Sequence, residues 1–163
     1  MIERFSSKTF REVLGRFATG VCVATSRRDA QLAGITINSF ASVSLTPALV
    51  LFSVGRALHS CEIFQQAQGF TINVLGSEQQ ALSNRFARAG EEKWLGVAHE
   101  DGLHDGVILP EALASFDCRR HAIHDGGDHL ILVGEVVDIR VADQSDRAPL
   151  VYYRGAYRSL TNE

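Results

Sequence analysis

The segment GITINSFASVSL, residues 34–45, constrains the fold most strongly, because it mixes strand-forming residues with small polar ones. Side chains along a β-strand alternate between the two faces of the sheet. With this period, four apolar residues share one face and four polar residues share the other: Ile35, Ile37, Val43 and Leu45 against Thr36, Asn38, Ser42 and Ser44. Ser39 and Phe40 break the alternation, so we expect a kink or β-bulge between residues 39 and 41. The polar face could bind a flat, polar ligand.

Further strand signals, which are β-branched and aromatic runs bounded by turn residues, recur along the chain. We expect strands over residues 21–26, 32–38, 41–45, 49–54, 70–75, 116–124, 129–141, 150–153 and 156–159. Helices are predicted from a capping box at Thr9 to Gly20, over residues 57–68, and from Ser77 to Gly90. Residues 91–110 lack periodicity and form a long connection.

The arrangement of these elements favours an antiparallel sheet. The first strands follow one another as a meander, and the turn at residues 125–128 predicts a hairpin. The sequence contains no G-x-G-x-x-G motif and no sustained alternation of strand and helix, which disfavours a parallel nucleotide-binding sheet. We therefore expect a single domain over residues 1–163, mainly β, built as an antiparallel barrel with peripheral helices.

Composition excludes several classes of protein. The net charge is −3 and the only lysines are Lys8 and Lys93, so there is no basic stripe for nucleic acid. No apolar run is long enough for a membrane span, and the N-terminal residues lack a signal core, so we expect a cytoplasmic protein. The three separated cysteines, Cys22, Cys61 and Cys118, suit neither a disulfide framework nor a zinc site.

Five segments, in order and spacing, resemble the short-chain flavin reductase family: FREVLGRFATGVCVAT, GITINSFASVSLTPALVLFSV, FTINVL, SNRFA and GDHLILVGEV. They extend over most of residues 10–160. The resemblance implies a split β-barrel, a homodimer, and reduction of FMN or FAD by NADH or NADPH. Many members supply reduced flavin to a separate flavin-dependent monooxygenase.

The same resemblance implies roles for the polar face of residues 34–45. It assigns Thr36, Asn38 and Ser39 to the flavin ring, and Ser42, Val43 and Ser44 to the ribityl chain and phosphate. Amide and hydroxyl dipoles suit both tasks, since negative charge develops on the ring during reduction and phosphate is an oxyanion. Composition alone favours a solvent-facing strand instead, and the resemblance reverses that preference.

The start of the helix after residue 55 is a candidate phosphate site, because free amides converge at a helix N-terminus. Arg56, His59 and Ser60 are the candidate ligands there. Leu58 and His59 occupy positions where relatives often carry hydroxyl groups and arginine. The sequence therefore leaves open whether FMN or FAD is the preferred flavin. Arg56 alone would more often be a surface charge. Phe86 is either helix core or part of the flavin wall.

His129 lies in the Gly127-Asp128-His129 motif, and the resemblance places it beside the nicotinamide and flavin rings as the candidate catalytic residue. Taken alone, it would more often be a core or edge residue. A rival interpretation is a metal site formed by His121, His124, Asp125, Asp128 and His129. His121 and His124 have opposite strand parity and would face apart, so no metal is predicted.

The resemblance, together with these residues, predicts an NAD(P)H:flavin oxidoreductase that binds and orients two planar rings for hydride transfer. A non-enzymatic flavin carrier on the same barrel is the alternative, followed by a metal-dependent enzyme. The sequence leaves open the preferred flavin, the preferred nicotinamide, whether flavin is a resident group or a substrate, and the partner oxygenase.

Overall fold

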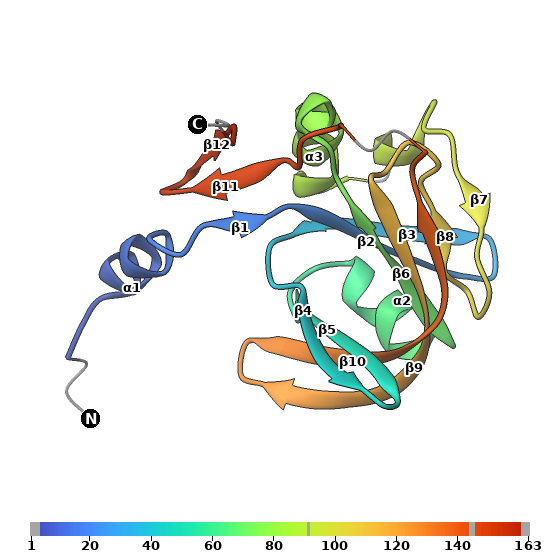
Figure 1. The fold of residues 1–163 in the computed structure, drawn as a ribbon. Helices are drawn as coiled ribbons and strands as arrows, with labels where there is room; N and C mark the ends of the chain where they lie inside the picture. The colour runs from blue at the N-terminus through green and yellow to red at the C-terminus, as the bar shows by residue number, and fades with distance from the viewer. Residues whose placement is uncertain (1–3, 91, 144–145, 161–163) are drawn as a thin grey trace.

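The computed structural model describes residues 4–90, 92–143 and 146–160 and is dominated by one large sheet (Figure 1). Its seven strands have the spatial order β3-β2-β6-β9-β10-β5-β4. Their bounds are β2 (Cys22–Arg28), β3 (Gln31–Ile37), β4 (Ala41–Leu45), β5 (Ala48–Gly55), β6 (Gly69–Val74), β9 (Ala114–Gly126) and β10 (His129–Val141). Every neighbouring pair is antiparallel, which confirms the predicted fold class.

β3 and β4 follow each other in the chain but lie at opposite edges of this sheet. The expected meander is therefore wrong: β2 pairs with β3, β4 pairs with β5, and the other strands lie between these two hairpins. Only residues 38–40 join the two edges, so the sheet must curl until they approach each other. The kink predicted between residues 39 and 41 falls in this link.

The two-faced pattern of residues 34–45 is confirmed on β3 and wrong on β4. Ile35 and Ile37 are buried, whereas Val43 exposes 49% and Leu45 93% of its surface. The pairing with β5 shifts between residues 42 and 44, so a bulge at Val43 breaks the alternation. The edge position of β4 leaves its side chains without a further strand to cover them.

Phenylalanine rings fill the space that the sheet encloses. Phe52 of β5 packs edge-on against Phe64 and Phe70, with ring centroids 5.4 and 4.9 Å apart. Phe64 belongs to α2 (Ser60–Gln66), which lies within the curl of the sheet in Figure 1. This helix is shorter than predicted, because the preceding residues form a turn in which the Leu58 amide donates to the Gly55 carbonyl.

A second apolar cluster covers the other face of β2. Val23 faces this cluster while Cys22 and Ala24 face the first one, as strand alternation requires. The cluster also contains Phe86 from α3 (Gln80–Ala87), which follows the short helix η1 (Ser77–Gln79). A small sheet of β1 (Thr19–Gly20), β11 (Val151–Tyr153) and β12 (Ala156–Arg158) lies beside it.

The long connection is more ordered than the sequence indicates. It contains η2 (Glu92–Trp94), β7 (Glu100–Asp101) and β8 (Val107–Ile108). The buried Asp117 carboxylate anchors it, because its two oxygens accept hydrogen bonds from Leu103 N at 2.5 Å and Thr71 Oγ1 at 2.9 Å. Asn73 Oδ1 likewise accepts from Leu109 N at 2.9 Å.

The first helix, α1 (Ser7–Leu14), projects away from the barrel (Figure 1). Ser6 is its N-cap, since the Ser6 hydroxyl accepts from Thr9 N at 3.1 Å, so the capping box predicted at Thr9 is wrong. We call residues 5–17, which include α1, the arm. Five apolar side chains of the arm are 51–78% exposed: Phe5, Phe10, Val13, Leu14 and Phe17.

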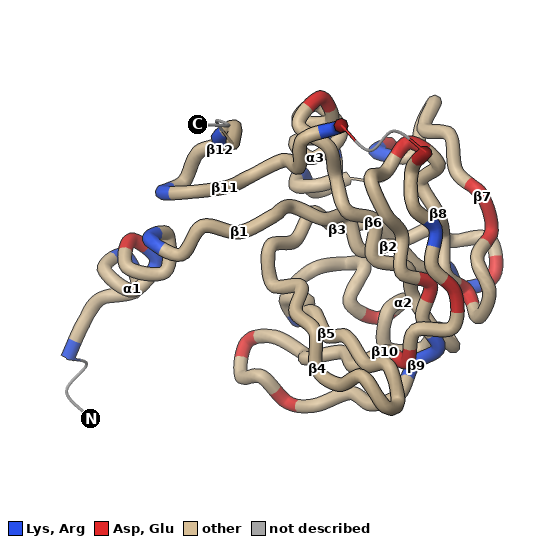
Figure 2. The backbone as a smooth tube through the Cα atoms, viewed as in Figure 1, with Lys and Arg blue, Asp and Glu red and all other residues tan. Residues whose placement is uncertain are grey.

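Charged residues of both signs are interspersed over the described chain in Figure 2. None of the helices described is long and apolar enough to cross a membrane.

Candidate functional site

A cavity of about 590 Å³ lies against β3 and is closed by the start of α2, the end of α3 and η2. Four of the predicted site residues line it: Thr36, His59, Ser60 and Phe86. The remaining walls are largely apolar, with Leu32, Ile35, Leu58, Ile63 and Trp94 among the lining residues. The cavity has the size and mixed character of a small-molecule site.

Aromatic packing sets the wall formed by Phe86. Its ring meets Trp94 edge-on, with centroids 4.9 Å apart, and only 1% of Phe86 is exposed. A Cβ on Gly34 would lie 2.5 Å from Phe86 Cε1 and 2.9 Å from Trp94 Cζ2. Glycine at this position of β3 therefore lets the two rings approach the strand. Phe86 is both core and cavity wall, so the two interpretations of this residue are compatible.

Lys93 lies at the same cavity and was not among the residues predicted from the sequence. Its Nζ donates to the Gly34 carbonyl at 2.9 Å and to the Arg88 carbonyl at 3.2 Å. Burial lowers the pKa of Lys93 from its ordinary value. The sequence clue was available: Lys93 is one of two lysines and falls in the long connection.

The polar residues at the cavity are partly engaged by the fold. The Thr36 hydroxyl donates to the Ser83 carbonyl at 2.6 Å, which leaves its oxygen free to accept. Ser60 begins α2 and is half-buried, and His59 precedes it without capping the helix through its side chain. These groups can contact a polar ligand without unfolding any element.

The residues predicted beyond Thr36 lie along the link and β4, outside the lining of the cavity. The Ser39 hydroxyl accepts from Ser53 N at 3.0 Å and so ties the link to β5. Asn38, Ser42 and Val43 are exposed. Ser44 Oγ accepts from Thr46 N at 3.2 Å.

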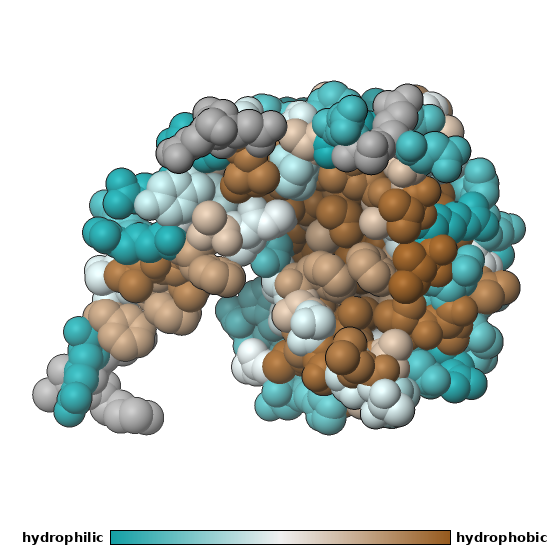
Figure 3. All heavy atoms as spheres, in the orientation of Figure 1, coloured by the Kyte–Doolittle hydropathy of each residue, from teal (hydrophilic) through white to brown (hydrophobic). Residues whose placement is uncertain are grey.

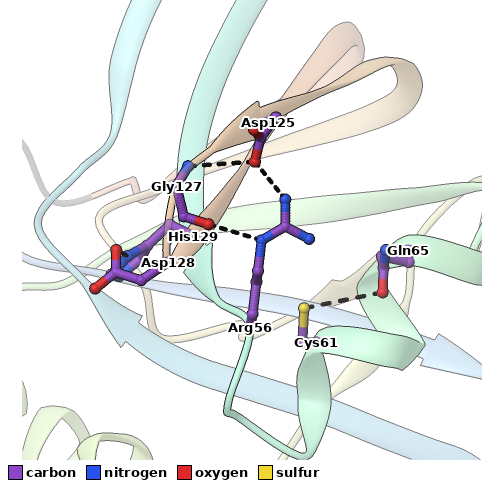
Figure 4. Close-up of polar contacts among 7 residues, drawn as sticks. All are labelled: Arg56, Cys61, Gln65, Asp125, Gly127, Asp128 and His129. Atoms are coloured by element: carbon purple, nitrogen blue, oxygen red, sulfur yellow. Dashed lines mark hydrogen bonds and ion pairs between the residues drawn. The ribbon is translucent and has the colours of Figure 1, made fainter.

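Arg56 is held by the β9–β10 turn (Figure 4). Its guanidinium donates to Asp125 Oδ1 at 2.5 Å and to the Gly127 carbonyl at 2.8 Å. This hydrogen bond lowers the pKa of Asp125. In this arrangement Arg56 fixes the turn that precedes His129, and two of its five N–H donors are used there.

His129 is the first residue of β10 and pairs with Gly55 of β5. Its Nδ1 lies 2.6 Å from Asp128 Oδ1, and this contact lowers the pKa of Asp128 (Figure 4). A Cβ on Gly55 would meet both His129 Nε2, at 3.7 Å, and Leu58 of the cavity wall, at 3.6 Å. The imidazole is 48% exposed, and His129 is near Gly55 and Leu58 but is not among the residues that line the cavity.

The candidate metal ligands His121, His124, Asp125, Asp128 and His129 lie on β9, the β9–β10 turn and β10. Within residues 4–90, 92–143 and 146–160, no three His, Cys, Asp or Glu side chains come together as metal ligands would. The site can bind, orient and desolvate a ligand. Its side chains include no nucleophile activated by a neighbouring base.

Comparisons with known proteins agree with this geometry. Residues 14–161 match the profile described as "Flavin reductase like domain". "FMN reductase (NADH) SmoA" of Agrobacterium fabrum is 42% identical over 97% of this chain and 88% of its own length. "Flavin-dependent monooxygenase, reductase subunit HsaB" of Mycobacterium tuberculosis is 34% identical over 100% of this chain and 87% of its own.

Solved structures share the fold as well. "Flavin reductase PheA2 in native state" has a TM-score of 0.87 and 35% identity, covering 97% of this chain and 100% of that one. The NADH:FAD oxidoreductase SgcE6 of Streptomyces globisporus, solved with NAD and FAD fragments, has a TM-score of 0.89 and 29% identity, covering 99% of this chain and 96% of that one.

Proposed function

The chain belongs to the flavin reductase-like family, and from this premise we propose that it is an NAD(P)H:flavin oxidoreductase. It transfers a hydride from NADH or NADPH to FMN or FAD and releases reduced flavin to a flavin-dependent monooxygenase. The observation that carries the proposal is the cavity of about 590 Å³, with its aromatic wall and cationic lining.

The residues fit a flavin. Flavin, when bound, supplies a ring that accepts a hydride, and the protein has to hold a second planar ring against it. Hydroxyl and amide groups of Thr36, Asn38 and Ser39 would contact the ring, and those of Ser42 to Ser44 its ribityl chain. Trp94 also lines the cavity, and its buried indole Nε1 has no hydrogen-bond partner within the described residues.

His129 is proposed to position the nicotinamide. Its Nε2 is a side-chain donor or acceptor beside Leu58 at the cavity, and Asp128 holds its other nitrogen. Such a pair fixes the orientation of an imidazole. The role is binding and orientation of the carboxamide, with no covalent chemistry required.

The arm supports a homodimer. Its five exposed apolar side chains contrast with the polar surface usual for an isolated helix. Figure 3 shows apolar residues on the arm and on the neighbouring face of the barrel. A second copy would cover both, and sedimentation equilibrium should give twice the chain mass. Phe10→Asp with Phe17→Asp should shift the mass toward one copy. We also place the protein in the cytoplasm, where reduced nicotinamides are available.

The deciding experiment is an anaerobic steady-state assay that crosses FMN and FAD with NADH and NADPH. Loss of flavin absorbance at catalytic protein concentrations supports the reductase. A stable yellow protein that ignores both nicotinamides would support a flavin carrier instead.

His129→Ala should raise the nicotinamide KM or lower kcat, with His121→Ala on exposed β9 as the matched control. Unchanged kinetics in both variants would remove His129 from the site.

A further inference from the structure

The C-terminal hairpin β11–β12 contacts the helix that forms one wall of the cavity. Phe86, near the end of α3, lines this cavity together with Thr36 of β3. Ser83 and Asn84, one turn or less before Phe86 on the same helix, are hydrogen-bonded to Tyr157 of β12. Tyr157 is not among the lining residues, so any effect it has on the cavity passes through α3.

The hydrogen bonds of Tyr157 have a defined direction. Its hydroxyl donates to Asn84 Oδ1 at 3.1 Å and lies 2.8 Å from Ser83 Oγ. A phenol has one proton, and that proton goes to Asn84, so the Ser83 hydroxyl donates to Tyr157. Ser83 is fully buried, with 0% of its surface exposed. Removing the Tyr157 hydroxyl would leave the buried Ser83 hydroxyl without this acceptor, which is unfavourable unless the helix shifts.

Ser83 also fixes the orientation of Thr36. The Ser83 carbonyl accepts a hydrogen bond from Thr36 Oγ1 at 2.6 Å. This bond uses the one proton of the Thr36 hydroxyl, so its oxygen can only accept from a bound ligand. Groups that bind a ligand must be held within about 0.5 Å of their working position. A small shift of Ser83 is therefore enough to turn the Thr36 hydroxyl or to release its proton.

The hairpin is anchored to the rest of the chain on its other side. Tyr152 of β11 pairs with Thr19 of β1, and its ring packs edge-on against Tyr157 with centroids 5.4 Å apart. In the turn of the hairpin, the Arg154 amide donates to the Gly15 carbonyl at 2.8 Å. Because the hairpin has this independent support, Tyr157 can hold α3 in place.

We propose that Tyr157 is a positioning residue for the flavin ring, acting through Ser83 on the Thr36 hydroxyl. The inference rests on the proposed function and deepens it, because it gives the C-terminal hairpin a part in ring binding. The ring is common to FMN and riboflavin, so Tyr157 should affect the binding of both to the same extent.

The test is a double-mutant cycle on flavin binding, with the Kd measured by quenching of flavin fluorescence, which requires no turnover. Tyr157→Phe and Thr36→Val should each raise the Kd for FMN and for riboflavin about three- to tenfold, as expected for one lost hydrogen bond. In the Thr36→Val protein, adding Tyr157→Phe should change the Kd by less than about 1.5-fold, because the hydroxyl that Tyr157 positions is gone.

Two further variants complete the experiment. Ser83→Ala breaks the same connection from the helix side and should reproduce the Kd of Tyr157→Phe. Tyr153→Phe is the matched control, because Tyr153 lies on the same hairpin with its ring against the Arg154 guanidinium, and its Kd should stay unchanged.

A merely structural role for Tyr157 would raise the Kd by the same factor with Thr36 present or absent, and that result would overturn the proposal. An unchanged Kd in both Tyr157→Phe and Ser83→Ala would overturn it as well. If the cycle is non-additive but neither nicotinamide reduces the bound flavin, the proposed function fails and this inference stands. If flavin is reduced and the cycle is additive, only this inference fails.

Discussion

The tight packing at Gly34 allows a quantitative prediction. In Gly34→Ala, the added Cβ would lie 2.5 and 2.7 Å from Phe86 Cε1 and Cδ1, and 2.9 Å from Trp94 Cζ2. Ordinary carbon contacts are about 3.5–4.0 Å apart, so the Phe86 ring must move by about 1 Å. Phe86 is 1% exposed, so its ring can move only by disturbing its packing or by entering the cavity that it lines.

Overpacking of this kind lowers the free energy of unfolding by about 1–3 kcal/mol. For a chain of this size, each kcal/mol lowers Tm by roughly 2–4 °C, so Gly34→Ala should melt roughly 2–12 °C below the unchanged protein. The FMN Kd should rise too, because the displaced rings enter the cavity. Circular dichroism melts and fluorescence titration measure the two effects.

Gly20→Ala is the matched control, because a Cβ on that strand residue meets nothing within 4 Å. Combining Gly34→Ala with Phe86→Leu should give a coupling energy of about 0.5–3 kcal/mol, since the smaller side chain relieves the clash. Equal Tm values for Gly34→Ala and Gly20→Ala would refute the reasoning.

Three other predictions use buried or desolvated groups. Burial raises the pKa of the Cys22 and Cys118 thiols to about 12. A thiol reagent at pH 8 should therefore leave both cysteines unlabelled until the protein is unfolded, and rapid labelling of the native protein would contradict this prediction. Asp117→Asn replaces one buried acceptor with a donor and should lower the free energy of unfolding by about 1–3 kcal/mol, measured by denaturant titration. Asp138→Asn is the control, because Asp138 lies opposite Asp117 on an exposed part of β10, and it should change the free energy of unfolding by less than about 0.5 kcal/mol. Because desolvation lowers the pKa of Lys93, its positive charge is lost as pH rises through that lowered value. Because Lys93 lines the cavity, the KM for FMN should then increase at alkaline pH while that for riboflavin stays flat, and parallel profiles would contradict an electrostatic contribution of Lys93 to FMN binding.

Local patterns in the sequence predicted the strands well. The strands at residues 41–45 and 129–141 have the predicted bounds, because turn residues flank both of them. The start of α1 was misplaced since Ser6 and Thr9 are both good caps, and the choice between them depends on the backbone. The family resemblance is confirmed.

Features that depend on distant parts of the chain could not be predicted. Placing β3 and β4 at opposite edges requires knowledge of which strands pair, and the exposure of Val43 and Leu45 follows from that placement. Lys93 reaches the cavity only because the long connection folds back onto Gly34, 59 positions earlier in the chain. The roles of the individual site residues remain predictions.

The three-residue link between β3 and β4 limits how far the two edges of the sheet can separate. Four peptide units separate Ile37 from Ala41, so these residues can be at most roughly 13–14 Å apart, whatever side chains the link carries. The opening of the barrel at this point thus has an upper bound set by chain length. Inserting one residue would raise that bound by about 3 Å, and substitution cannot do the same. In this protein, the distance between the two sheet edges at this point is encoded by the number of residues in the link as well as by their identity.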